Sequence, residues 1–300
     1  MVGASIVSQP YRGEADLLRL REFVMENYRR NNYWHVGDVV WRIFLISIDF
    51  DPGENIRLFE HAGRVVAFAI YDPREPSIGW QLALRDTACE EELLEWAAAR
   101  FVRLGQPRGR LLAGAWETDT YKRALLERHG FHSTGQGYRL NVLDLRDWRA
   151  PDGLANYPVR CLTGEEEHAI RAQAHREVFR PSRVTDESYL HLMRMPGYER
   201  GLDLLAEAPG GQIGAFCLIW EDALNNVGEF EPVGTRPAFR RQGMARAVLV
   251  EGLRRLQVRG CTSAVVWVDA DNTPAIALYE SVGFRCMQRD ISYEYRDHPS

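Results

Sequence analysis

Cysteine is scarce in this sequence of 300 residues. The five cysteines are an odd number without the paired spacing of metal ligands, and several lie in apolar stretches. The eight histidines show no metal-ligand spacing either. We therefore expect buried, reduced thiols and no metal. The cysteines are Cys89, Cys161, Cys217, Cys261 and Cys286.

Long apolar runs and extended basic runs are also lacking. No apolar stretch approaches the roughly 20 residues that a helix needs to cross a bilayer, and no basic-then-apolar signal segment begins the sequence. The net charge of -5 argues against nucleic acid as the main partner. We expect a cytoplasmic protein without membrane or nucleic-acid partners, and its 45% apolar content is enough for two domain cores.

The most informative segment is a turn between an expected strand at 227–234 and an expected helix that begins near Gly243. A helix start has unpaired N–H groups and a partial positive charge, so such a turn can bind a pyrophosphate, and a glycine there allows close approach. The alternative is an ordinary turn with surface arginines. The residues of this turn are Arg240, Arg241, Gln242, Gly243, Met244 and Ala245.

A second motif follows about thirty residues later. A strand is expected at 262–268, and the turn at 271–275 carries a proline close to a helix start. That helix contains Tyr279 and stops at Gly283, and a last strand is expected at 284–295.

Together the two segments resemble the core of the GNAT superfamily of acyl-coenzyme-A-dependent N-acetyltransferases. The family's loop pattern, Gln/Arg-x-x-Gly-x-Gly/Ala, is matched at Arg240, Gly243 and Ala245. A later pattern, Asn-x-x-Ala-x-x-Leu-Tyr-x-x-x-Gly-Phe, is matched from Asn272 to Phe284. The resemblance is strong over 227–295 and extends more weakly back to about residue 157.

The upstream segments have the element order that the GNAT fold requires. Apolar runs at 204–208 and 213–220 are joined by Pro209-Gly210-Gly211, which predicts a hairpin. Helices are expected at 165–179 and 186–195. The implied fold class is α/β (α+β), with a mixed, mainly antiparallel central sheet flanked by helices.

The first half of the chain reads as a second copy of this pattern. Residues 63–70 parallel 211–218, and residues 125–131 parallel 278–284. We therefore predict two tandem GNAT-like domains, 1–150 and 151–300, an arrangement similar to that of tandem relatives such as mycothiol synthase.

The two copies differ where the chemistry is expected. At the loop position, residues 85–92 of the first copy have no glycine and four acidic side chains, which would repel a pyrophosphate. Leu126 stands where the second copy has Tyr279. We expect a degenerate, non-catalytic domain at 1–150, a catalytic acetyl-CoA-binding domain at 151–300, and one cofactor per chain. The first domain would shape the substrate site or an interface, for example in a homodimer.

For the reaction, the resemblance implies acetyl transfer from acetyl-CoA to a primary amine of a small molecule, by direct attack in a ternary complex. It assigns the backbone N–H of Val233 to the acyl carbonyl and Thr235 to the pantetheine arm. The resemblance also makes Tyr279 the candidate general acid, because in the family a tyrosine at this helix position has its hydroxyl near the thioester sulfur. Its unperturbed pKa of about 10 leaves it protonated at neutral pH. The remaining cofactor-binding residues are Arg240, Arg241, Gln242, Gly243, Met244, Ala245 and Asn272.

The general base and the acceptor site are less defined. Glu229 and Glu231 share a face of the expected strand, and Glu229 has about the offset of the glutamate base in histone-acetylating relatives. Many members use water chains instead, and both alternatives stay open. Phe179, Arg180 and Tyr189 are expected to line the acceptor pocket, but no residue selects a particular amine.

Two other functions fit parts of the sequence. One is a non-catalytic CoA-binding sensor or interaction module, and the other is an aminoacyl or peptidyl transferase of similar tandem fold. The acidic net charge gives little support to a tRNA-linked donor. Asn272, Tyr279 and Glu229 are all present, which favours the acetyltransferase.

Overall fold

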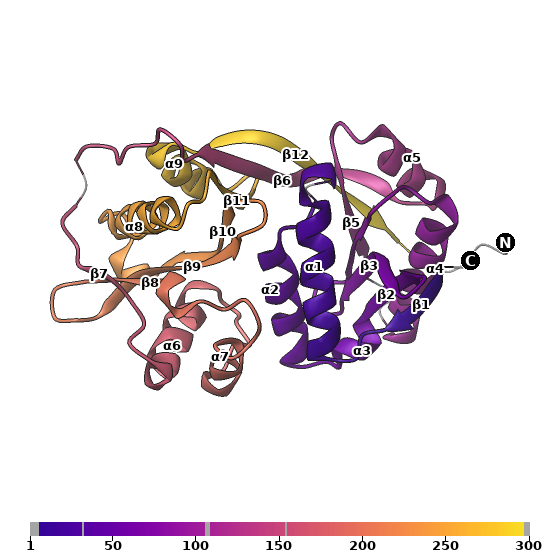
Figure 1. Cartoon of the computed structure of the whole chain (residues 1–300), viewed down its shortest axis with the longest axis horizontal. Coiled ribbons are helices and arrows are strands. Elements are labelled where there is room, and N and C mark those ends of the chain that lie inside the picture. Colours follow the sequence, from indigo (N-terminus) through magenta and orange to yellow (C-terminus); the bar gives the residue numbers. More distant parts are fainter. Residues whose placement is uncertain (1–5, 32, 106–108, 154, 297–300) are drawn as a thin grey trace. The chain divides into compact units, whose positions relative to one another are not determined.

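A computed structural model describes residues 6–31, 33–105, 109–153 and 155–296 of the chain. The chain forms two compact units (Figure 1). Unit 1 comprises Met1–His35, Arg42–Arg139 and Gln288–Ser300, and unit 2 comprises Val36–Trp41 and Leu140–Met287. Helix α2 (Val36–Ser47) and strands β6 (His132–Asp144) and β12 (Arg285–Tyr295) contribute residues to both units.

In unit 1 the strands are ordered β1-β2-β3-β4-β5-β12-β6. The pairs from β1 to β4 are antiparallel, β4 and β5 are parallel, and β5 and β12 are antiparallel. The further elements of this unit are β1 (Val7–Pro10), α1 (Glu14–Asn31), α3 (Pro52–Asn55), β2 (Ile56–His61), β3 (Arg64–Asp72), β4 (Ser77–Leu82), α4 (Thr87–Arg103), β5 (Leu111–Trp116) and α5 (Thr120–Arg128).

Unit 2 repeats this arrangement with the strand order β12-β6-β11-β10-β9-β8-β7. Here α8 and α9 lie on one face of the sheet and α6 and α7 on the other (Figure 1). The further elements are β7 (Val159–Cys161), η1 (Glu165–Glu167), α6 (His168–Val178), α7 (Asp186–Leu192), η2 (Arg200–Leu202), β8 (Asp203–Glu207), β9 (Ile213–Asp222), β10 (Val227–Thr235), η3 (Pro237–Phe239), α8 (Met244–Val258), β11 (Ser263–Asp269) and α9 (Thr273–Val282).

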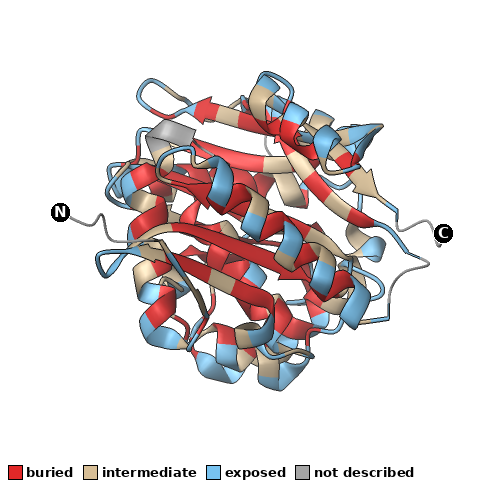
Figure 2. Ribbon diagram, turned by 90° about the vertical axis from the view of Figure 1, so that its right-hand side faces the viewer, coloured by how far each residue is buried: buried red, intermediate tan, exposed pale blue. Residues whose placement is uncertain are grey.

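Each unit has its own apolar core, because the sheet strands are buried while the outer faces of the helices are exposed (Figure 2). In unit 2 the apolar stripe of α8 packs on strands β8 to β11; Val248, Leu249 and Leu253 are fully buried there. In unit 1 the corresponding core lies between α4, α5 and the sheet. Burial of these stripes is the main favourable contribution to folding of both units.

The predicted elements of the second half are confirmed within a few residues. The hairpin at Pro209-Gly210-Gly211 joins the antiparallel strands β8 and β9. The helix expected at 165–179 begins as a 3-10 turn and becomes α-helical at His168. No helix in the described part of the chain is long and apolar enough to span a membrane.

The compact units are not two contiguous halves of the chain. The boundaries of the units differ from a seam at 150/151 because β6 leaves unit 1 at Leu140, β12 enters unit 1 at Gln288, and the first residues of α2 belong to unit 2. Sequence patterns cannot show such exchanges, since each strand pattern is compatible with either sheet.

Candidate active site

The candidate site of unit 2 is built around β10. This strand pairs with β11 in parallel only from Val227 to Glu229. Its antiparallel pairing with β9 is interrupted by a bulge between Phe230 and Val233 and then continues to Thr235. The end of β10 therefore separates from β11, which opens the sheet at this point.

The register shows where the backbone of the strand end points. The N–H of Arg236 donates to the carbonyl oxygen of Gly214 at 2.9 Å, so Arg236 and Gly214 form a hydrogen-bonded antiparallel pair. Because such pairs alternate, the N–H groups of Val233 and Thr235 point away from β9 and towards the side where pairing with β11 has ended. Two backbone donors thus face the opening, as an acyl carbonyl and a pantetheine amide require.

The predicted phosphate loop leads directly into α8. Gly243 caps the helix with a φ of 85°, a conformation that favours glycine. The first intrahelical bond runs from the Ala247 N–H to the Gly243 carbonyl, so the N–H groups before it have no partner inside the helix. The first turn contains no acidic residue. These features fit a pyrophosphate at the helix N-terminus.

The side chains of the loop divide into two groups. Arg240, Arg241 and Gln242 are exposed and available to a ligand in solution, although the Gln242 amide also donates to the Ala238 carbonyl at 3.2 Å. Met244 is buried at 1% exposure and anchors the helix, and Ala245 packs on the same core. Met244 and Ala245 can therefore contribute backbone N–H groups, while the arginines contribute positive charge.

Tyr279 lies on α9, next to the loop helix α8, in the core cluster of unit 2. Its ring packs edge-on against Phe284 at 6.0 Å, and only 7% of the residue is exposed. Burial raises the pKa of the Tyr279 hydroxyl, and Glu231 and Cys217 raise it further. Cys217 is the register partner of Val233, and Tyr279, Cys217 and the partly buried Val233 belong to the same core cluster.

The two carboxylates of β10 differ strongly in exposure. Glu229 is fully buried, whereas Glu231 is half-buried. Burial raises the pKa of Glu229 to about 8, with a further contribution from Glu231, while hydrogen bonds from Asp38 act in the opposite direction. Trp220 is the register partner of Glu229, and its indole N–H donates to the Glu231 carbonyl at 2.7 Å.

Asn272 caps α9. Its side-chain oxygen accepts a hydrogen bond from the Ala275 N–H at 3.2 Å. This is the usual role of an asparagine directly before a helix, and the proline that follows belongs to the first turn. The structure thus gives Asn272 the task of orienting the helix that carries Tyr279.

The three residues expected to line the acceptor pocket differ in their exposure to solvent. Phe179 and Arg180 are exposed at the end of α6. Tyr189, by contrast, is fully buried, and its hydroxyl donates to Asp203 Oδ2 at 2.5 Å. It therefore does not line a solvent-facing pocket, because the buried Asp203–Arg171 pair, with N–O distance 2.8 Å, holds it in the core.

Sequence reasoning missed a histidine in this region. The His175 ring packs at a tilt against Phe179, with 4.7 Å between ring centroids, and its centroid lies 5.7 Å from that of the Trp41 ring. Burial lowers the pKa of His175 to about 3, and Arg171 and Arg176 lower it further, so the imidazole is neutral at physiological pH. In the sequence, His175 lies within the helix expected at 165–179, where only its amphipathic spacing could be recognised.

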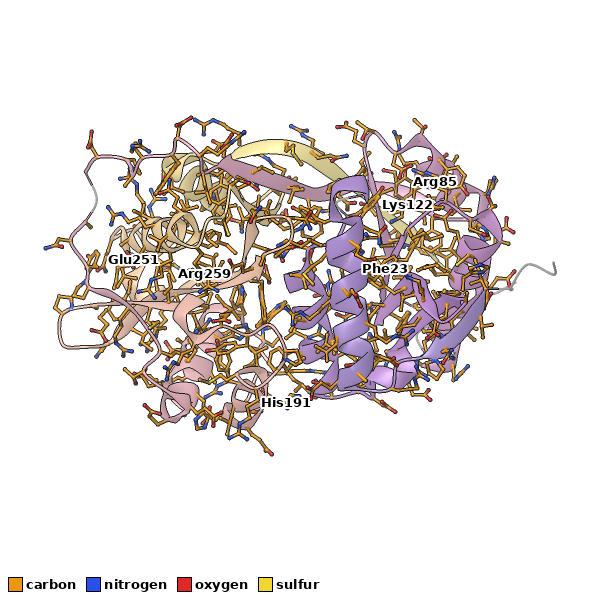
Figure 3. All side chains as sticks on the ribbon, in the orientation of Figure 1. Phe23, Arg85, Lys122, His191, Glu251 and Arg259 are labelled. Atoms are coloured by element: carbon orange, nitrogen blue, oxygen red, sulfur yellow. The ribbon has the colours of Figure 1, made fainter. Side chains whose placement is uncertain are left out.

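Unit 1 has a comparable strand divergence with different contents. Strands β4 and β5 pair in parallel only at Ser77 and Ile78. Beyond them the Lys122 ammonium lies 3.9 Å from the Trp80 ring and 4.1 Å from the Tyr33 ring. Lys122 lies beside Arg85 (Figure 3). Because only 5% of Lys122 is exposed, burial lowers the pKa of its ammonium group to about 8.

Two polar side chains of this region, Tyr33 and Asp86, have hydrogen-bond partners within unit 1. The Tyr33 hydroxyl accepts from the Trp116 N–H at 3.0 Å and donates to Asp119 at 2.9 Å. At the start of α4 the Asp86 side chain accepts from the Cys89 N–H at 3.0 Å, as expected of an N-cap. The helix N-terminus that would hold a pyrophosphate in unit 2 is thus capped here by a carboxylate.

Comparison with known proteins agrees with this architecture. The model of the acetyltransferase (GNAT) family matches residues 169–284. The chain is 30% identical over 256 residues to a mycothiol acetyltransferase from Streptomyces bingchenggensis, covering 78% of each chain. It is 29% identical over 210 residues to a mycothiol acetyltransferase from Streptomyces avermitilis, covering 63% of this chain and 67% of the relative.

Two solved structures show the same fold over nearly the whole chain. A tandem GNAT protein from the clavulanic acid biosynthesis pathway matches with a TM-score of 0.67 at 14% identity, covering 99% of this chain and 100% of that one. A GCN5-related N-acetyltransferase from Sphaerobacter thermophilus matches with a TM-score of 0.65 at 20% identity, covering 98% and 96%. The chain therefore belongs to the GNAT family of acyl-CoA-dependent acetyltransferases and has the fold of its tandem members.

Proposed function

We propose that the chain transfers an acetyl group from acetyl-CoA to the primary amine of a small molecule, by direct attack in a ternary complex in unit 2. The observation that carries this proposal is the open end of β10, where the Val233 and Thr235 N–H groups point away from β9 and where Val233 packs in the same core cluster as Tyr279. A backbone donor at this place can stabilise the negative charge that develops on an acyl oxygen.

The cofactor would be held mainly by backbone groups. The N-terminus of α8 and the exposed Arg240 and Arg241 suit its pyrophosphate, and Thr235 suits the pantetheine arm. When bound, acetyl-CoA supplies an activated acyl group and a thiolate leaving group. Tyr279 would donate its proton to that thiolate, since its raised pKa keeps the hydroxyl protonated throughout the neutral range.

The titration that tests the cofactor site is calorimetric binding of acetyl-CoA to the intact chain. We expect one site per chain, because the corresponding divergence in unit 1 is filled by Lys122, Trp80 and Tyr33, and its helix N-terminus is capped by Asp86. A stoichiometry of two would contradict a silent first domain at 1–150, and no binding would contradict the proposed reaction.

Glu229 is the proposed proton acceptor for the amine. Because its side chain is fully buried, we propose that the proton reaches it through water rather than by direct contact with the acceptor. A primary ammonium has a pKa near 10.4 and must lose a proton before it attacks. A carboxyl group with a pKa of about 8 is a suitable base near neutral pH.

The variant Glu229→Gln tests this role. A base acts in its deprotonated form, so turnover of the wild type should rise as the pH increases through about 8. In Glu229→Gln we expect turnover at pH 7.5 to fall about 100-fold and to recover partly at pH 9.5, where more of the amine is neutral. The measurement is a steady-state pH profile, with Glu231→Gln as the matched variant. Loss in Glu231→Gln alone would assign the role to Glu231 instead.

The acceptor is proposed only as a class. The two relatives described above are named mycothiol acetyltransferases, and this chain would accordingly use a small amine. The exposed Phe179 and Arg180 would lie at the entrance of its acceptor pocket. Tyr189 would support that wall from inside through Asp203. An interface between two copies of the chain stays a proposal without a surface assigned to it.

A further inference from the structure

The first turn of α2 packs directly on the candidate proton acceptor. Although α2 follows the first helix of the chain, its residues Val36–Trp41 belong to compact unit 2. A Cβ atom on Gly37 would lie 2.5 Å from Glu229 Oε2, far closer than real Cβ contacts. The helix backbone therefore approaches the Glu229 carboxyl as closely as a residue without a side chain allows.

Asp38 adds hydrogen bonds at the same place. Both its backbone N–H and its side chain interact with the Glu229 carboxyl, and each lowers the pKa of Glu229. A helix N-terminus favours a carboxylate through its unpaired N–H groups and its partial positive charge. The titratable groups that act on Glu229 are thus Glu231 from its own strand and Asp38 from α2.

Gly37 also contacts the residue that fixes the bulge. A Cβ atom added at Gly37 would lie 2.5 Å from Trp220 Cγ, and Trp220 is 1% exposed. The Trp220 indole holds the Glu231 carbonyl at 2.7 Å, next to the point where β10 leaves its regular register. One turn later, Trp41 lies against the His175 ring of α6. The helix start thus contacts the carboxyl group, the bulge and α6.

We propose that Gly37 and Asp38 are positioning residues, which hold the Glu229 carboxyl in the orientation needed for proton transfer. The proposal rests on the function proposed for Glu229 above. It gives the first half of the chain a direct part in the reaction, because a segment of that half completes the catalytic unit. Gly37 provides the close approach, and Asp38 provides the hydrogen bonds.

The first variant is Gly37→Ala, with Gly201→Ala as its control. A methyl group at Gly37 must displace Glu229 or Trp220, whereas a Cβ on Gly201 meets no atom within 4 Å. We expect kcat to fall about 10-fold or more in Gly37→Ala, with the Kd for acetyl-CoA within about twofold of the wild type. Gly201→Ala should behave as the wild type.

A second variant covers the case in which Gly37→Ala does not fold. Asp38→Ala keeps the backbone N–H but removes a hydrogen bond that lowers the pKa of Glu229. Since the folded-state pKa should then rise, the increasing limb of the pH profile should move to higher pH, by about one unit. A purely structural role would lower thermal stability and leave this midpoint in place.

Combination with Glu229→Gln separates the positioning role from the proposed function. If Gly37 acts through Glu229, Gly37→Ala should reduce kcat less than twofold further in the Glu229→Gln background. Wild-type kcat and pH profile in both Gly37→Ala and Asp38→Ala would overturn the positioning proposal alone. Wild-type activity of Glu229→Gln would overturn the role of Glu229 and the positioning proposal with it.

Discussion

Acetyl-CoA binding should fall by at least about 100-fold in Gly243→Glu. Gly243 caps α8 with a φ of 85°, and a Cβ there would lie 3.2 Å from the Ala155 Cβ. The glutamate would place negative charge at the helix N-terminus, where repulsion between two unit charges 4 Å apart is worth about 4 kcal/mol at an effective dielectric constant of 20. Calorimetry on the intact chain measures the loss.

The matched control for this variant is Gly260→Glu. Gly260 has a φ of 86° at the other end of the same helix, and a Cβ there meets no atom within 4 Å. The two substitutions therefore introduce the same charge and similar backbone strain, but only Gly243→Glu does so at the helix N-terminus. Equal loss of binding in both variants, or unchanged binding in Gly243→Glu, would rule out a pyrophosphate at this turn.

Turnover should fall about 100-fold to 1,000-fold in Tyr279→Phe, while the Kd for acetyl-CoA stays unchanged. The phenyl ring can keep the contact with Phe284, so the core should remain packed, but the leaving thiolate loses its proton donor. Steady-state kinetics gives kcat, and calorimetry gives the Kd. Because the pKa of Tyr279 is raised, its loss should not remove the limb that rises with pH through about 8.

Tyr295→Phe is the control for removal of a tyrosine hydroxyl from a partly buried ring. Tyr295 lies on β12 in unit 1, where its ring is 5.6 Å from the Phe131 ring, and no catalytic role is assigned to it. It should retain wild-type turnover. If Tyr279→Phe also turns over at the wild-type rate, Tyr279 is a core residue and the thiolate is protonated by another group.

The sequence patterns predicted those features that local spacing determines. The strand, the arginine-rich turn and α8 follow one another within a short segment, so the Gly243 cap and the buried stripe could be predicted. The same is true of the turn at 271–275, whose proline precedes α9. In each case a residue type and its neighbours in the chain fix the local geometry.

The contacts between distant segments could not be predicted. That the Val233 and Thr235 N–H groups face the opening depends on the bulge after Phe230, which moves the register by one residue. The helical spacing of Tyr189 does not show that Asp203 binds its hydroxyl in the core. The approach of Gly37 to Glu229 joins segments from opposite halves of the chain, and no local pattern connects them.

The exchange of strands also has a consequence for synthesis of the protein. In unit 1, β12 lies between β5 and β6, and its residues Asp290–Tyr295 pair with β5. A ribosome that adds about 5–20 residues per second needs on the order of ten seconds to translate the chain between β6 and β12. Throughout that interval the sheet of unit 1 lacks its inner strand β12. Unit 1 therefore begins to be synthesised first but is among the last parts of the protein to be completed.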